Sequence, residues 1–177
     1  MQQTSTQKFT AFFFLRDVGL GLLLWLLLTA AVGEARMVFS GSMEPTIRVG
    51  DRIWTDKLFV RWESLERGDI VVFDPPFPAE DAYVKRIVGL PGETVEVKGG
   101  SVWIDGRPLT EPYAEVASYR YGPVQIPAGE YFVLGDNRNI SYDSHRWGLL
   151  SRERIIARAV CRIWPFGRAG RIGLTGP

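Results

Sequence analysis

A hydrophobic run near the N-terminus places the strongest constraint on how this chain can fold. Residues 18–33 (VGLGLLLWLLLTAAVG) contain no charged side chain, and Lys8 and Arg16 precede them. As a helix, this run is about 24 Å long, close to the roughly 30 Å of a bilayer's hydrocarbon core. Two interpretations fit: a retained membrane anchor, or a secretory signal that is cleaved within residues 33–35, where Gly33 and Ala35 are small. Both predict that the chain after Glu34 is translocated to the far side of a membrane.

Beyond Glu34 the sequence has the pattern of β-strands. Short segments rich in β-branched and aromatic residues are separated by Gly, Pro and Asp, and a Gly-Gly pair within residues 94–106 indicates a hairpin. The predicted strands lie in residues 69–73, 83–90, 94–106, 130–136 and 155–164. We therefore expect a mainly β fold of twisted antiparallel sheets. The expected organisation is a cytoplasmic tail and anchor over residues 1–35, followed by a catalytic β-domain over residues 36–177.

The composition excludes several classes of function. Lys and Arg total 21 against 20 Asp and Glu, so no basic excess points to a nucleic-acid partner. The single Cys161 and single His145 give no metal-binding cluster, and we expect neither a metal nor a cofactor. Residues 155–164 alternate between two faces, with Cys161 on the apolar one, so we expect this thiol to be a small buried hydrophobe.

Two residues, His145 and Lys85, are candidates for the general base that would activate a serine nucleophile. No serine lies in a G-x-S-x-G motif, and Ser42 is not part of an S-x-x-K motif because Pro45 stands three residues after it. A triad would have to use His145 with an acid such as Asp136 or Asp143. The other candidate base is Lys85, which shares a strand face with Tyr83 and Ile87. Burial there would have to lower the lysine pKa to about 7–8, a shift worth roughly 4 kcal/mol.

A polar segment, residues 135–148 (GDNRNISYDSHRWG), follows the strand at 130–136. It is either a capped loop, in which side chains satisfy backbone amides, or a polar shell that orients a nucleophile or its base. The residues alone leave both interpretations open.

Four segments in order resemble the type I signal peptidases, membrane-anchored Ser-Lys proteases that remove signal peptides from exported proteins. They are residues 40–46 (SGSMEPT), 67–73 (RGDIVVF), 83–93 (YVKRIVGLPGE) and 135–148. The resemblance covers nearly all of residues 38–165. It implies a mainly β fold, a retained anchor and secretory preproteins as substrates. It also implies a single-pass protein of the plasma or thylakoid membrane, with a cytoplasmic N-terminus and the catalytic domain on the far side of the bilayer.

The resemblance also assigns roles to individual residues. Ser42 matches the nucleophile and Lys85 its general base, while Ser40 matches the hydroxyl that joins the Ser42 amide in the oxyanion hole. Ser141 would orient the lysine amine, and Asp143 would support that site. The expected substrate-binding residues, for signal peptides of the A-x-A type, are Val38, Phe39, Ala82, Tyr83 and Val84.

The chain departs from the family pattern at three positions. Phe39 replaces a proline, Ile140 replaces an asparagine, and His145 stands where many members carry arginine. Asp-Ser-His at this place is similar to members from cyanobacterial and plastid membranes. Two rivals remain: a related Ser-Lys protease that cleaves itself, and a catalytically silent, membrane-tethered β-domain that binds the export machinery. The residues give no indication of the oligomeric state.

Overall fold

The computed structural model describes residues 14, 16–24 and 32–173. Residues 16–24 are helical, and among the described residues no helix combines the length and hydropathy needed to cross a bilayer. Residues 25–31 of the predicted anchor lie outside the described residues, so the anchor stays a prediction. The rest of the described chain is mainly β, as expected, and is arranged as two antiparallel sheets.

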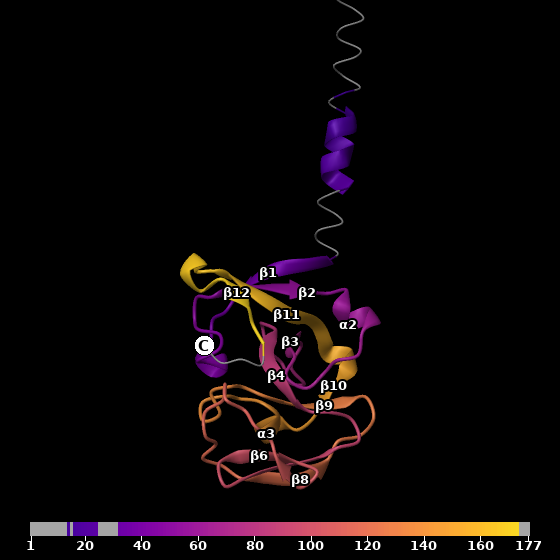
Figure 1. Ribbon diagram of the computed structural model, residues 1–177. Coiled ribbons are helices and arrows are strands. Elements are labelled where there is room, and N and C mark those ends of the chain that lie inside the picture. Colours follow the sequence, from indigo (N-terminus) through magenta and orange to yellow (C-terminus); the bar gives the residue numbers. More distant parts are fainter. Residues whose placement is uncertain (1–13, 15, 25–31, 174–177) are drawn as a thin grey trace, which may run out of the picture.

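The larger sheet has eight strands and carries most of the fold (Figure 1). Its strand order is β1-β2-β11-β3-β4-β9-β10, with β12 paired to β11. The strands are β1 (Gly33–Met37), β2 (Arg52–Asp56), β3 (Ile70–Phe73), β4 (Tyr83–Gly89), β9 (Glu130–Leu134), β10 (Leu150–Ser151), β11 (Ile155–Trp164) and β12 (Gly170–Arg171). Every pair in it is antiparallel.

The smaller sheet, in the order β7-β6-β5-β8, lies below the larger one in Figure 1. Its strands are β5 (Thr94–Lys98), β6 (Ser101–Ile104), β7 (Arg107–Pro108) and β8 (Tyr121–Gln125). The predicted hairpin is confirmed: Gly99 and Gly100, with φ of 58° and 84°, form the turn between β5 and β6. A two-residue turn of this kind needs positive φ at both positions, which glycine adopts without strain.

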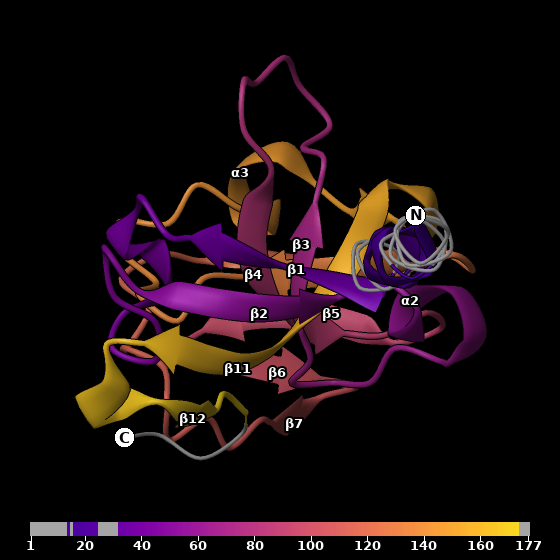
Figure 2. The same cartoon turned by 90° about the horizontal axis from the view of Figure 1, so that it is seen from above.

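Short helices join the strands: η1 (Gly41–Met43), α2 (Phe59–Trp62), α3 (Ser144–Trp147), η2 (Arg152–Arg154) and η3 (Phe166–Arg168). The connection between β3 and β4 is different, since it forms a loop that projects from the body of the domain (Figure 2). Its last residues, Asp81 and Ala82, lead directly into β4.

Strands β4 and β9 lie between hydrophobic clusters, so both of their faces are buried. Alternation along β4 sends Ile87 into one cluster with Phe73 and Val133, and Val88 into another with Phe132 and Leu134. Strands buried on both faces have near-continuous apolar sequences. This accounts for the run at 130–134 in β9, and for the run at 70–73 in β3, where all four residues are buried. A third cluster, which includes Val38 and Met43, lies beneath η1.

The alternation predicted for β11 holds over its first half. Ile155, Ala157 and Ala159 are buried, but the register with β2 shifts between Ala159 and Cys161. A bulge inserts an unpaired residue and turns the following side chains. Cys161 is therefore only half-buried, and the prediction of a buried thiol is wrong.

Candidate active site

Ser42 and Lys85 meet across the fold. Ser42 is the second residue of η1, which begins after the extended Ser40, and the Ser42 side chain is buried. Lys85 lies on β4, opposite Val71 of β3, with only 3% of its surface exposed. Their Oγ and Nζ atoms are 2.6 Å apart, and Nζ also donates to the carbonyl of Val84 at 3.1 Å. A hydroxyl and an amine at this distance can exchange a proton directly.

The surroundings of Lys85 favour its neutral form. Burial lowers the pKa of the amine from 10.5 to about 8, while the carboxylates of Asp143 and Asp136 oppose this change. The Tyr83 ring contributes to the burial, since its centroid lies 5.5 Å from Nζ. The alternation of β4 predicted this neighbour. A buried lysine with a lowered pKa beside a serine hydroxyl has the properties of a general base.

Ser40 contacts Ser42 twice. Its hydroxyl donates to Ser42 Oγ at 3.0 Å and accepts from the Ser42 amide at 3.3 Å. Ser40 is exposed to the cleft side of η1, whereas Ser42 is buried. A hydroxyl and an amide that lie this close together can both turn their hydrogens toward one oxygen atom of a ligand.

Ser141 and Asp143 lie close to the pair, but neither bonds directly to the Lys85 amine. Ser141 Oγ is buried and has no hydrogen-bond partner among the described residues. Asp143 is fully buried and caps α3, accepting from the Gly135 amide at 2.9 Å. Gly135 itself is packed so tightly that a Cβ there would lie 2.3 Å from both the Ser42 carbonyl oxygen and Ser141 Oγ. Glycine at this position therefore allows the polar segment to approach the serine.

A cleft of about 300 Å³ opens onto the serine and the lysine. All five predicted substrate-binding residues line it: Val38, Phe39, Ala82, Tyr83 and Val84. Five other residues line the cleft and were not predicted to do so, although Ile140 was noted as a departure from the family pattern: Met37, Met43, Asp81, Ile140 and Tyr142. The apolar Ile140 within a polar segment was the one signal available. It is 67% exposed, and Phe39 is 70% exposed.

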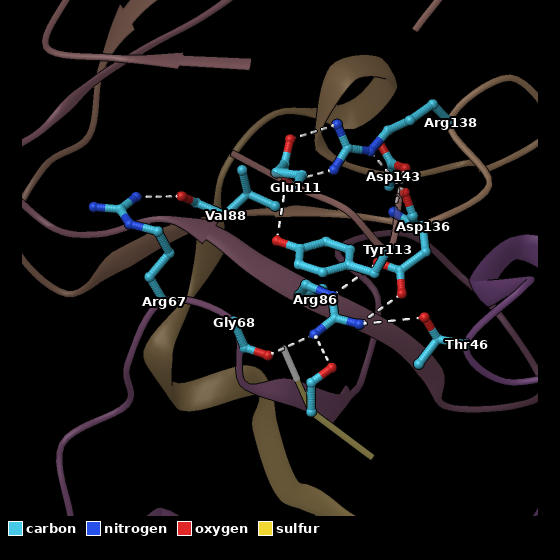
Figure 3. Close-up of polar contacts among 12 residues, drawn as sticks. Thr46, Arg67, Gly68, Arg86, Val88, Glu111, Tyr113, Asp136, Arg138 and Asp143 are labelled. Atoms are coloured by element: carbon cyan, nitrogen blue, oxygen red, sulfur yellow. Dashed lines mark hydrogen bonds and ion pairs between the residues drawn. The ribbon is translucent and has the colours of Figure 1, made fainter. Parts of the chain in front are cut away.

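A buried network of charges on the opposite face of β4 was not predicted from the sequence (Figure 3). The fully buried Arg86 donates to both carboxylate oxygens of Asp136, at 2.8 and 2.6 Å, and its guanidinium lies 3.8 Å from the Tyr113 ring centroid. Arg138 is paired in the same way with Glu111, at 2.9 and 2.6 Å. The Arg86–Asp136 pair joins the polar segment that contains Gly135 to β4, and the Arg138–Glu111 pair joins the same segment to the connection between β7 and β8.

The described residues contain no group of three or more His, Cys, Asp or Glu side chains that could hold a metal ion. His145 does not contact the serine directly; its ring bonds to Asp143 at 2.7 Å.

Comparison with known proteins identifies close relatives. The family model "Signal peptidase, peptidase S26" matches residues 12–164. The "Signal peptidase I" of Leptolyngbya laminosa is 45% identical over 167 residues, which cover 90% of this chain and 82% of that protein. The "Probable signal peptidase I-2" of a Synechocystis strain is 48% identical over 78% of this chain and 66% of its own length. The "Thylakoidal processing peptidase 1, chloroplastic" of Arabidopsis thaliana is 38% identical over 79% of this chain and 44% of its own length.

Proposed function

We propose that Ser42 is the nucleophile of a peptidase reaction and Lys85 its general base, because this chain belongs to the type I signal peptidase family, peptidase S26, and to its cyanobacterial and plastid branch. The enzyme is a serine endopeptidase that removes signal peptides from secretory preproteins. The observation that carries the assignment is the 2.6 Å contact between Ser42 Oγ and the buried Nζ of Lys85.

The reaction follows from this contact. Neutral Lys85 accepts the Ser42 proton while Oγ attacks the scissile carbonyl carbon, and the carbonyl oxygen becomes an oxyanion. The Ser42 amide and the Ser40 hydroxyl donate to that oxygen once Ser40 turns away from Ser42. Removing one such donor typically costs about 10²–10³ in rate. The lysine then protonates the leaving amine, and the mature protein departs. Water that is deprotonated by the same amine hydrolyses the acyl-enzyme and releases the signal peptide.

The substrate adds to the sheet as an extended strand. Pairing of β4 with β9 begins at Arg86, so residues 83–85 pair with β3 on one side only. Main-chain hydrogen bonds along this edge would supply affinity, and small pockets would select alternate side chains. Val38, Tyr83 and Val84 line the cleft, and membership of the family implies that it accepts small residues at the first and third positions before the cut. Phe39 and Ala82, which also line the cleft, would contact the substrate as well.

The hydrophobic run holds the enzyme at its membrane, with residues 1–35 as tail and anchor and residues 36–177 as the catalytic domain. Strand β1 begins at Gly33 and pairs with β2 through Met37. The small residues Gly33 and Ala35 thus lie within the sheet, which supports a retained anchor over a cleaved signal. The catalytic domain would lie on the far side of a plasma or thylakoid membrane, close to the bilayer.

The test is cleavage of an A-x-A preprotein by the full chain in detergent or liposomes. Ser42→Ala and Lys85→Ala should each abolish cleavage. Lys98→Ala is the matched control, since this lysine pairs with Glu96 on the small sheet, and it should retain full activity. Retained activity in Lys85→Ala would refute the assignment of the base. Failure of an acylating active-site inhibitor to label Ser42 in folded protein would instead favour a silent binding domain.

A further inference from the structure

His145 is the residue of α3 that connects this helix to the candidate active site. Its Nδ1 atom lies 2.7 Å from Asp143 Oδ1, and its side chain is 7% exposed. The ring is stacked on Tyr119, with centroids 4.0 Å apart and planes 15° from parallel. Because a carboxylate only accepts hydrogen bonds, the proton of a neutral imidazole must lie on Nδ1. The stacking and the hydrogen bond together fix the ring.

The contact continues from His145 to the nucleophile. Asp143 has no exposed surface, and its second oxygen accepts from the Gly135 amide at 2.9 Å. Gly135 is packed against the Ser42 carbonyl oxygen, where it has no room for a side chain. A carboxylate bonded at both oxygens cannot rotate freely. Oδ1 also accepts from the His145 backbone amide at 3.3 Å, so the imidazole makes the shorter of two bonds at this oxygen. The His145 ring therefore contributes to the position of Gly135, and with it to the backbone around Ser42.

Asp143 also acts on the base through its charge. After burial, which lowers the pKa of Lys85, the Asp143 carboxylate is the largest opposing influence, followed by Asp136. A neutral imidazole leaves the carboxylate charge uncompensated, whereas an arginine side chain would always bring a positive charge. The other charged or titratable groups that act on this region are Tyr119, Arg138, Glu111 and Arg146. Substitution at position 145 leaves them unchanged.

We propose that His145 is a positioning residue, which fixes the Asp143 carboxylate against Gly135 and sets how strongly that carboxylate retains the proton of Lys85. The proposal rests on the assignment of Lys85 as the base. It predicts that the side chain at position 145 changes the pH at which the enzyme becomes active, and not only the maximal rate.

The geometric part is tested by nitrogen-15 NMR of the imidazole in the full chain in detergent micelles. The chain has one histidine, so the spectrum needs no assignment among residues. We expect the neutral ring to carry its proton on Nδ1. A neutral ring protonated on Nε2 would overturn the proposal, because Nδ1 would then be unable to donate to Asp143. This arm does not depend on which residue is the catalytic base.

The functional part is tested by the pH dependence of kcat/KM for preprotein cleavage. In His145→Arg the midpoint of the acidic limb should fall by about half a pH unit to one unit, because a fixed positive charge near Asp143 disfavours the ammonium of Lys85. In His145→Phe, which keeps an aromatic ring for Tyr119 but has no donor, the midpoint should rise and the maximal rate should fall. His145→Asn retains a donor near the Nδ1 position and should restore the wild-type midpoint.

Arg146→Gln is the control, since Arg146 is exposed and adjacent on α3. It should move the midpoint less than either change at position 145. The midpoint should fall in His145→Arg and rise in His145→Phe. Each variant has its own expected direction, so one folded variant is enough to test the proposal. Wild-type midpoints in the folded variants would overturn the proposal, because a purely structural role would change the rate alone. If Lys85→Ala were active, the assignment of the base would fail first, and the NMR result would still report on His145 and Asp143.

Discussion

Replacing Lys85 with methionine should stabilise the folded enzyme at pH 7, although it removes the proposed base. Burial lowers the pKa of Lys85 from 10.5 to about 8. At 1.36 kcal/mol per pH unit, this shift corresponds to about 3 kcal/mol of destabilisation whenever the amine is protonated in both the folded and the unfolded state. Methionine has a similar length and carries no charge, so its burial does not incur this cost.

The sign of the effect depends on pH in a defined way. Below about pH 8 the amine is protonated in both states, and the folded wild-type protein bears the whole cost. Between about pH 8 and 10.5 the unfolded chain binds the proton and the folded protein does not, so the stability of the wild type rises with pH. The advantage of Lys85→Met should therefore be largest at pH 7 and should shrink by about 3 kcal/mol as the pH approaches 10.5. Loss of the contact with Ser42 offsets it by about 1 kcal/mol at every pH.

Urea unfolding of the full chain in detergent, followed by tryptophan fluorescence, measures this difference at pH 7 and pH 10. Other titrating groups are common to both proteins and cancel in the comparison. Lys98→Met is the control, since the Lys98 side chain is 43% exposed and should show almost no pH-dependent difference. A difference between Lys85→Met and wild type that stays constant from pH 7 to pH 10 would refute the argument that Lys85 is strongly desolvated.

Two further substitutions test the packing behind the candidate site. Gly135→Ala should lower kcat at least about 10²-fold, because its Cβ would lie 2.3 Å from the Ser42 carbonyl oxygen and from Ser141 Oγ. Relieving this overlap would displace the backbone, and a displacement of about 1 Å has effects of this size. Cleavage assays measure kcat, and a normal value would contradict the close approach. Arg86→Met should lower the free energy of unfolding by about 3–5 kcal/mol, because it leaves the buried Asp136 carboxylate without its partner. Chemical denaturation measures this loss, and Asp136→Asn combined with Arg86→Met should recover part of it if the unpaired charge is the cause.

The strands of the domain were predictable because their signal is local. Alternation and turn residues located β3, β4, β9 and the hairpin of the small sheet. The same alternation placed Tyr83 and Lys85 on one face. It failed at Cys161, where a bulge in the pairing with β2 shifts the register. A bulge depends on how the partner strand fits, which the sequence of one strand does not specify.

The face of β4 opposite Lys85 shows a further limit of local patterns. Alternation along β4 places Arg86 on the face opposite Lys85, and a charged residue on a strand usually faces solvent. The fold instead covers that face with Tyr113 and Asp136, and Arg86 has no exposed surface. The elements that supply these partners lie 27 and 50 residues further along the chain.

By itself, the sequence determined the mainly β character of the domain, the candidate serine and lysine, and five of the residues that line the cleft beside them. Only the tertiary structure decided that Ser42 Oγ and Lys85 Nζ lie 2.6 Å apart, that Ser141 Oγ makes no hydrogen bond to a described residue, and that His145 bonds to Asp143. The physical reason is that periodicity fixes which face a side chain occupies. What covers that face, and how far a lysine is thereby desolvated, depends on segments distant in the sequence.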